Sequence, residues 1–341
     1  MALRLMDSFD HYTGQGDRLT KWTADINASG NVEAGTGRFG SCWPNQNNSR
    51  SMYKQFDAQA TWIIGAAIRV DTFTGVGDIP LFVFLDGGSR QVYVRIQANT
   101  GKLQVIREAS NSLGVGSFIF STNVWYFIEF KATINNTTGI AVVRVNGVTD
   151  INLSSQDTQA TANATADQVA LNGGAIGTTG ANPRYDDVYI CDGTGSDDFR
   201  GDHRIEALFP NGNGTTSQLV GQDANSTDNY LNVDETAPDG DTTYNESSTV
   251  NDKDTYAYTN LTPGAGAIAA IQILPYARKT DAGVRSIKTV ARHSGTEVDS
   301  ADFTLATTYE YHEDIRTTKP GGGSWSVSDI NAAEFGVKVS A

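Results

Sequence analysis

One group of residues in this sequence has a spacing that could bind a nucleotide. Gly35, Gly37 and Gly40 form the pattern G-x-G-x-x-G, which cradles a dinucleotide pyrophosphate when a strand precedes it and a helix follows. Residues 43–49 come next, and their proline and three asparagines disfavour a helix. These glycines therefore need another explanation, and we predict that the chain binds no nucleotide or other cofactor.

Asp186 and Asp187 are the second group that could do chemistry. Jelly-roll glucanases place acidic residues two apart on one strand, in the pattern E-x-D-x-x-E, so that nucleophile and acid/base share a face. No such triplet occurs here, and adjacent carboxylates on a regular strand point to opposite faces. We expect the two aspartates to accept backbone hydrogen bonds at a turn or strand end. We predict no catalytic residue and no enzymatic activity.

Metal and nucleophile chemistry have little support in the sequence. The motifs G-x-S-x-G and H-E-x-x-H are absent, and the histidines stand singly, without ligand spacing. Asp234, Glu235, Asp239 and Asp241 could collect a calcium ion, although their order does not match an EF-hand loop. An acidic stretch such as 221–254 is more often a solvated surface. We predict no metal site, with calcium as the open alternative.

The elements that would position these residues are mostly strands. Side chains alternate between apolar and polar along several runs, which is typical of half-buried strands. The predicted strands are 91–97, 102–107, 125–134 and 140–145. Asn146-Gly147 predicts a tight hairpin turn after the last of them. Strands of this length separated by turns predict an all-β antiparallel sandwich.

The chain has 341 residues, enough for two β domains. The polar, glycine-rich stretch 191–198 marks the predicted boundary, which places the domains at 1–200 and 201–341. No helical period is convincing before residue 200. One short C-terminal helix is predicted over 328–335, with Ser328 as its cap and Gly336 at its end.

Composition narrows the range of partners. The formal net charge is −14, which argues against binding to nucleic acid or to an anionic membrane surface. No apolar run is long enough to span a bilayer or to serve as an export signal. Cys42 and Cys191 are too few for a disulfide framework, so we expect buried free thiols, with a disulfide between the two as the alternative.

Several short motifs resemble the concanavalin A-like (laminin-G-like) jelly rolls of tailed-bacteriophage proteins. They are DSFDHY at 7–12, KW at 21–22, GRFG at 37–40, RVNG at 144–147 and YDDVYI at 185–190. The resemblance implies a jelly-roll sandwich over about the first 200 residues. It also implies that the glycines around Arg38 turn the chain into an early strand and that Phe39 packs inward.

The second half resembles a β module that is attached to such jelly rolls in phage virion proteins. The segments are FPNGNG at 209–214, VDETAPDGDTTY at 233–244 and PGGGSW at 320–325. The two resemblances together imply a virion structural protein in a tail, fibre or capsid-decorating position, assembled in the host cytoplasm. Its partners would be other virion proteins and, by analogy with other particles, further copies of itself.

A glycan-binding adhesin that recognises the host cell surface is the alternative function. Such a site needs exposed aromatic side chains for sugar stacking, with polar neighbours on loops. Trp22, Trp43 and Tyr185 are the candidate glycan contacts. A polysaccharide-degrading enzyme is a third possibility, and it lacks the carboxylate pattern that such an enzyme needs.

Overall fold

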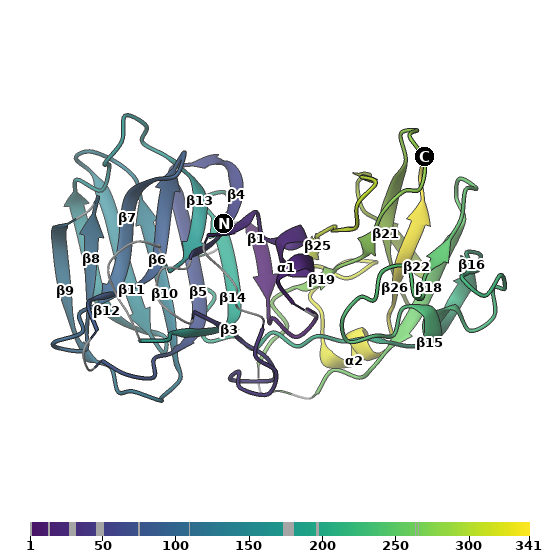
Figure 1. Cartoon of the computed structure of the whole chain (residues 1–341), viewed down its shortest axis with the longest axis horizontal. Helices are drawn as coiled ribbons and strands as arrows, with labels where there is room; N and C mark the ends of the chain where they lie inside the picture. The colour runs from purple at the N-terminus through teal and green to yellow at the C-terminus, as the bar shows by residue number, and fades with distance from the viewer. Residues whose placement is uncertain are drawn as a thin grey trace. The chain divides into compact units, whose positions relative to one another are not determined.

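The structure is a computed structural model, and it describes residues 2–12, 14–26, 32–45, 51–73, 76–108, 110–172, 181–195, 198–262, 264 and 266–341. These residues form two compact units (Figure 1). Unit 1 comprises Met1–Asp10 and Gly14–Ile205, and unit 2 comprises His11–Thr13 and Glu206–Ala341. Residues 196–197, which are part of the predicted domain boundary, lie outside the described residues. So do residues 46–49, the end of the segment 43–49 that was predicted to be non-helical.

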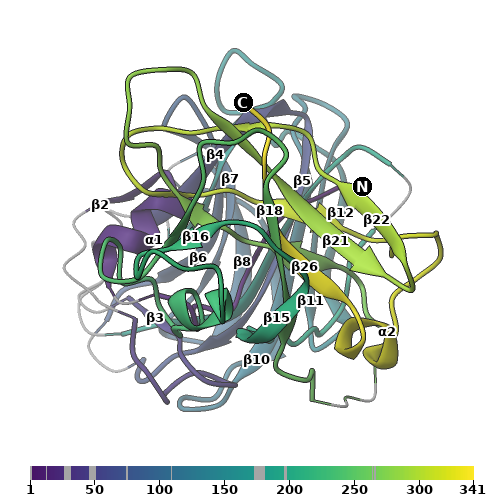
Figure 2. The same ribbon diagram turned by 90° about the vertical axis from the view of Figure 1, so that its right-hand side faces the viewer.

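Unit 1 is a sandwich of two antiparallel sheets, whose strands are drawn in Figures 1 and 2. Sheet A has the order β1-β14-β5-β10-β11-β12, with β3 beside β14. Its strands are β1 (Leu3–Asp7), β3 (Trp43–Pro44), β5 (Thr61–Arg69), β10 (Tyr126–Thr133), β11 (Gly139–Val145), β12 (Val148–Gln156) and β14 (Arg184–Asp192). Strands far apart in the sequence therefore lie side by side, since the first and last strands of the unit are neighbours.

Sheet B has the order β2-β4-β13-β6-β7-β8-β9. Its strands are β2 (Ala24–Ile26), β4 (Ser51–Gln59), β6 (Ile79–Asp86), β7 (Ser89–Ile96), β8 (Lys102–Arg107), β9 (Asn111–Ile119) and β13 (Ala166–Leu171). The two sheets meet through their apolar faces. Phe84 of β6 stacks on Phe130 of β10 with 5.0 Å between the ring centroids, and both are fully buried. The Trp62 indole of β5 donates to the Ala166 carbonyl oxygen of β13 at 2.8 Å.

The predicted all-β sandwich class is confirmed, and the four predicted strands correspond to β7, β8, β10 and β11. Asn146 and Gly147 have φ of +49° and +79°, the backbone of the tight hairpin turn that their sequence predicts. The expectation that the C-terminal helix is the one helix of the chain is wrong, because α1 (Gln15–Lys21) forms in unit 1, although its seven residues make fewer than three turns. This helix is short and polar, and it has no hydrophobic period that a sequence pattern could reveal.

Unit 2 is built on a six-stranded antiparallel sheet, sheet C, in the order β15-β18-β26-β21-β22, with β23 beside β21. Its strands are β15 (Pro210–Ser217), β18 (Lys253–Tyr258), β21 (Ser286–His293), β22 (Thr296–Asp299), β23 (Phe303–Thr304) and β26 (Glu334–Val339). The described part of the unit also contains three two-stranded ribbons, a 3-10 helix, η1 (Asn229–Asn232), and a short helix, α2 (Val327–Asn331). The ribbons pair β16 (Val220–Gly221) with β17 (Asn245–Glu246), β19 (Ile271–Ile273) with β25 (Asp314–Arg316), and β20 (Tyr276–Ala277) with β24 (Glu310–Tyr311).

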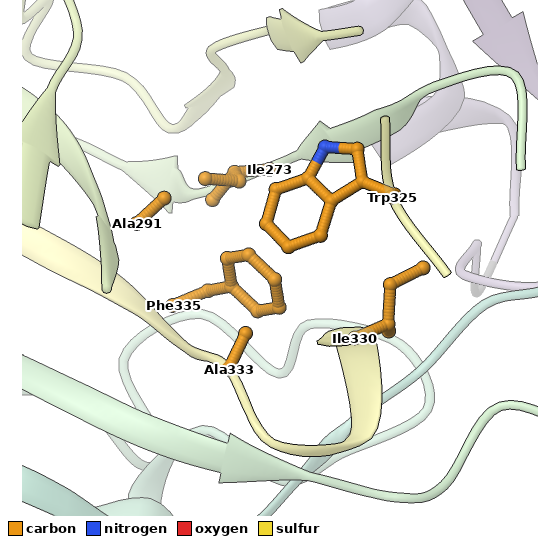
Figure 3. Packing of buried hydrophobic residues seen from close by; sticks show 6 residues of the cluster. All are labelled: Ile273, Ala291, Trp325, Ile330, Ala333 and Phe335. Carbon is orange, nitrogen blue, oxygen red and sulfur yellow. The ribbon is translucent and has the colours of Figure 1, made fainter. Parts of the chain in front are cut away.

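A compact apolar cluster forms the core of unit 2 (Figure 3). Its members come from three strands, the short C-terminal helix and the segments beside that helix: Ile273, Ala291, Trp325, Ile330, Ala333 and Phe335. The ring centroids of Trp325 and Phe335 lie 5.9 Å apart in this cluster. The core therefore ties the ribbon of β19, sheet C and the helix together.

The C-terminal helix is shorter than predicted. Helix α2 (Val327–Asn331) begins after Ser326, whose hydroxyl accepts a hydrogen bond from the Asp329 backbone N–H at 3.2 Å. The predicted cap at Ser328 and the predicted end at Gly336 are both wrong. Phe335 lies in β26 opposite Ala291 of β21, because the strand buries its ring in the core of unit 2. In the part of the chain that the structure describes, no helix has the length and apolar character to cross a membrane.

Candidate functional site

The candidate site is the outer face of sheet A, where β14 carries two adjacent aspartates. The pairing of β14 with β5 shifts register between Asp186 and Tyr189, and Asp187 has a left-handed backbone with φ of +52°. Such a bulge interrupts the strict alternation of side chains. Both carboxylates reach Arg38, one through its backbone and one through its guanidinium. The prediction that the two aspartates point to opposite faces is therefore wrong.

Asp186 holds the glycine-rich turn. Its Oδ2 accepts the backbone N–H groups of Arg38 at 2.7 Å and Phe39 at 3.0 Å, and its Oδ1 accepts the Asp187 N–H at 2.7 Å. A Cβ atom at Gly37 would lie 2.2 Å from the Ser41 carbonyl oxygen, so only glycine fits there. The G-x-G-x-x-G pattern is thus a turn, as predicted, and its N–H groups bind a carboxylate of the chain itself.

Phe39 does not pack inward, which corrects the expectation drawn from the family resemblance. Its side chain is 38% exposed. The guanidinium carbons of Arg38 and Arg204 lie 5.1 and 4.7 Å from the ring centroid, a cation–π arrangement at the surface. Because the backbone N–H of Phe39 is drawn toward the buried carboxylate of Asp186, the ring is left on the outside of the turn.

Residues 198–205 cross the outer face of sheet A, and we call this segment the strap. Three of its backbone N–H groups donate to side chains of the sheet. Gly201 donates to Glu129 Oε1 at 2.7 Å and Arg200 donates to the Tyr189 hydroxyl at 3.1 Å. Ile205 donates to Asp187 Oδ1 at 2.7 Å. The strap therefore supplies hydrogen-bond donors to three side chains of sheet A, Glu129, Asp187 and Tyr189, which would otherwise be buried without these donors.

Side chains add further contacts between the strap and the sheet. The carboxylate of Asp202 accepts hydrogen bonds from both terminal nitrogens of the Arg38 guanidinium, one of them at 2.9 Å. Lys131 of β10 donates to Asp198 at 2.9 Å. The Arg144 guanidinium carbon of β11 lies 4.1 Å from the centroid of the Phe199 ring.

The electrostatics of this face are unusual because its acids are buried. Glu129, Asp186 and Asp187 are 0% exposed. Burial, reinforced by the neighbouring charge of Asp187, raises the pKa of Asp186. Burial also raises the pKa of Asp187. The phenol of Tyr189 donates to Glu129, and burial together with that carboxylate raises the pKa of Tyr189. The carboxylates of this face hold backbone segments of the turn and of the strap.

Sequence reasoning found the aspartates of this site and missed their companions. Glu129 of β10 and Tyr189 of β14 contact each other on the outer face of sheet A, where Tyr189 belongs to an apolar cluster with Ile63, Ala67, Phe127 and Cys191. An acidic residue within an apolar strand run is the signal that could have indicated Glu129. The strap carries no such signal, because its role depends on the sheet beneath it.

The three candidate glycan contacts are not at the surface. Trp22, Trp43 and Tyr185 are 1%, 0% and 0% exposed. The Trp22 indole donates to Asp7 at 2.7 Å, and the Tyr185 hydroxyl donates to the Leu81 carbonyl oxygen at 3.3 Å. These aromatic side chains fill the core of unit 1, so the prediction that they contact a glycan is wrong for this structure.

The carboxylates considered for calcium have other partners in unit 2. Asp241 pairs with Arg278 at 2.8 Å and accepts the Tyr309 hydroxyl at 2.9 Å. The carboxylates of Glu235 and Asp239 both lie within hydrogen-bond distance of the Thr243 hydroxyl, which is the donor. Among the described residues, no group of three or more His, Cys, Asp or Glu side chains is placed to hold a metal ion.

The cysteines are free and buried, as expected from their number. Burial raises the pKa of the Cys42 thiol to about 11, so this thiol is protonated at neutral pH.

Asp186 offers a direct test of how the turn is held. Replacing Asp186 by alanine leaves three backbone N–H groups without their acceptor, which is expected to destabilise unit 1 by about 3 kcal/mol. Asp186→Asn keeps one side-chain oxygen as an acceptor and removes the repulsion with Asp187, so its loss should be much smaller. Urea unfolding of unit 1 measures both variants. Equal stability of the alanine variant and the unaltered chain would contradict this account.

No family model and no curated protein matches this chain. Solved structures with a similar fold include "Cellulose induced protein, Cip1", at 13% identity and a TM-score of 0.40, over 55% of this chain and 97% of that protein. Alginate lyase Aly36B matches at 11% identity and a TM-score of 0.40, over 55% of this chain and 95% of the lyase. Trypanosoma rangeli sialidase matches at 10% identity and a TM-score of 0.35, over 47% of this chain and 27% of the sialidase.

These matches correct one prediction. We predicted that the chain is not an enzyme, and the solved structures of similar fold include a lyase and a sialidase, which are enzymes. The sandwich fold therefore gives no ground for excluding catalysis. At these identities and TM-scores the matches carry no activity, substrate or partner over to this chain.

Proposed function

We propose that this chain is a structural protein of a tailed-bacteriophage particle, in a tail, fibre or capsid-decorating position, where it contacts other virion proteins. The observation that supports this role best is the outer face of sheet A. Its buried carboxylates bind the backbone of the glycine-rich turn and of the strap. These charges fasten the chain to itself and leave a rigid body that can present its surface to neighbours.

The construction of the chain and its sequence resemblance support the same role. Each unit has apolar clusters of its own, which suits a protein that joins partners through two separate bodies. The motifs of both halves resemble those of phage virion proteins. The net charge of −14 suits a protein that stays soluble at high local concentration before it assembles. Assembly in the host cytoplasm and association with further copies of the chain belong to this proposal.

Particles of a phage that encodes the chain provide the test. We expect the chain to co-sediment with density-purified particles at a constant ratio to a major capsid protein. A chain-specific antibody should label one location on the particle in electron micrographs. The chain produced alone in host cells is the control and should stay in the supernatant. Absence of the chain from purified particles would overturn the proposal.

The alternative function, a glycan-binding adhesin, loses its three named contacts because they are buried. Binding of the purified chain to an array of bacterial surface polysaccharides would favour the adhesin and would direct the search to other residues. No binding across the array is the result expected for a structural protein.

A further inference from the structure

We propose that the side chain of Asp150 in β12 closes the free edge of β9 and so keeps a second copy of the chain from pairing with that strand. This autoinhibitory contact goes beyond the proposed particle role, and its test does not depend on that role. Three observations carry the proposal: the composition of β9, the exposed apolar side chains around it, and the hydrogen bonds that Asp150 accepts from it.

The first observation concerns β9 as an edge strand. The described strands of sheet B end at β9, which pairs with β8 (Figure 1). An edge strand has backbone N–H and C=O groups on its outer side, and these groups can pair with a strand of another molecule. Natural edges are usually short or carry charged residues or proline. β9 is nine residues long, Asn111–Ile119, and contains neither a charged residue nor proline.

The second observation is that exposed apolar side chains gather at this edge. Among the described residues of unit 1, five large apolar side chains are exposed, and four of them lie on β9, on β12 or just before β10. They are Val115, Ile119, Val124 and Val148. Val148 is 71% exposed and Ile119 is 61% exposed. Exposed apolar surface of this kind is typical of sites of protein contact.

The partner that fits this edge is a second copy of the chain. The formal net charge of −14 makes two copies repel each other over most of their surface. No charged residue lies between Glu108 and Glu129, so β9 is a place where two copies meet with little repulsion. Antiparallel pairing of β9 with β9 of another copy also has two-fold symmetry, in which both copies offer the same surface. A basic partner would find no carboxylate on β9 to bind.

The third observation is that Asp150 occupies this edge. Its Oδ1 accepts the backbone N–H groups of Ser117 at 2.8 Å and Phe118 at 2.9 Å, and the Ser117 hydroxyl at 3.1 Å. The pairing of β9 with β8 shifts register over these residues, and the pairing of β12 with β11 shifts at Asp150. A bulge and a charged side chain directed at the edge are two devices that prevent pairing between chains.

The fit of Asp150 beside β9 is close and has an energetic cost. A Cβ atom at Gly116 would lie 1.9 Å from Asp150 Oδ2, so glycine leaves the room that the carboxylate fills. Asp150 Oδ2 is buried without a hydrogen-bond partner among the described residues, and such an oxygen is destabilising. Ser117 is exposed, so water can reach the edge if the carboxylate is removed. We therefore expect Asp150→Ala to fold and to leave the edge open.

Sedimentation velocity of the full chain over a range of concentrations tests the inference. We expect Asp150→Ala to raise the self-association constant by about tenfold or more over that of the unaltered chain, because the variant frees two backbone donors and uncovers an uncharged strand. Hydrogen exchange should show protection of the amides of 111–115 that increases with the concentration of the variant. Equal association of the variant and the unaltered chain would overturn the proposal, and so would association without protection of 111–115.

Two control variants separate loss of the edge contact from loss of a carboxylate. Asp150→Asn keeps an oxygen acceptor for β9, so its association should equal that of the unaltered chain. Asp86→Ala removes a carboxylate that also accepts side-chain hydrogen bonds, from Thr161 and Asn163, but it lies in β6, which is not an edge strand. Association of Asp86→Ala should also stay unchanged. A rise equal to that of Asp150→Ala would make the effect a general consequence of destabilisation and would contradict the proposal.

Two further variants test the edge from the side of β9. Asp150→Ala with Val115→Lys places a charge on the open edge, so association should return to that of the unaltered chain although the hydrogen bonds of Asp150 are still missing. Persistent association of this double variant would overturn the pairing through β9. Gly116→Ala keeps Asp150 but displaces its carboxylate, and it should raise association as Asp150→Ala does. If Asp150→Ala does not fold, Gly116→Ala decides, and no rise in its association would overturn the proposal.

Discussion

Replacing Gly336 by alanine is expected to destabilise unit 2 by at least about 3 kcal/mol. Gly336 lies in β26, between β18 and β21 at the centre of sheet C. A Cβ atom there would lie 1.9 Å from the Asp254 carbonyl oxygen and 2.8 Å from the Thr255 Cα. These are backbone atoms of the neighbouring strand, so no side-chain rotation relieves the overlap. Differential scanning calorimetry of the full chain measures the loss as a lower midpoint of the unfolding of unit 2.

Gly264 provides the matched control in the same unit. Among the residues that the structure describes, no atom lies within 4 Å of a Cβ built at this position, so Gly264→Ala should change stability by less than about 0.5 kcal/mol. The unfolding of unit 1 should be unaffected by either substitution, which tests that the two units have separate cores. If Gly336→Ala unfolds with the same midpoint as Gly264→Ala, the packing of β26 against β18 is not as described.

Phe130→Ala is expected to have the second large effect, a loss of about 3–5 kcal/mol in unit 1. The Phe130 ring is fully buried and stacks on Phe84 at an interplanar angle of 6°, so it joins sheet A to sheet B. Truncation removes this contact and leaves a cavity between the sheets, because neither strand can move to fill it without breaking its backbone hydrogen bonds to the neighbouring strands. Urea unfolding monitored by circular dichroism measures the change.

Phe39→Ala is the control, because this ring is 38% exposed and contacts two arginines at the surface. Its loss should not exceed about 1 kcal/mol. The two phenylalanines thus separate burial from residue type. Equal losses for both variants would mean that Phe39 is buried in solution, as the family resemblance implied and the structure contradicts.

The candidate site shows where local patterns stop being informative. The aspartates were expected to accept backbone hydrogen bonds, and they do. Their shared face was not expected, because a bulge at Asp187 arises from the pairing of β14 with β5 and leaves no mark in the sequence. Glu129 lies in another strand, and only the sheet brings it beneath the strap.

Local patterning predicts four strands of unit 1, among them β7 and β10, because alternation with period two is a property of neighbouring residues. The turn at Asn146-Gly147 is also predictable from the sequence, because it depends on local backbone preferences. Three features follow only from the packing of the whole chain: Phe335 lies in a strand, the side chains of Trp22, Trp43 and Tyr185 are buried, and acids from different strands meet under the strap. Burial and charge coupling depend on contacts between residues far apart in the chain, and no local pattern encodes them.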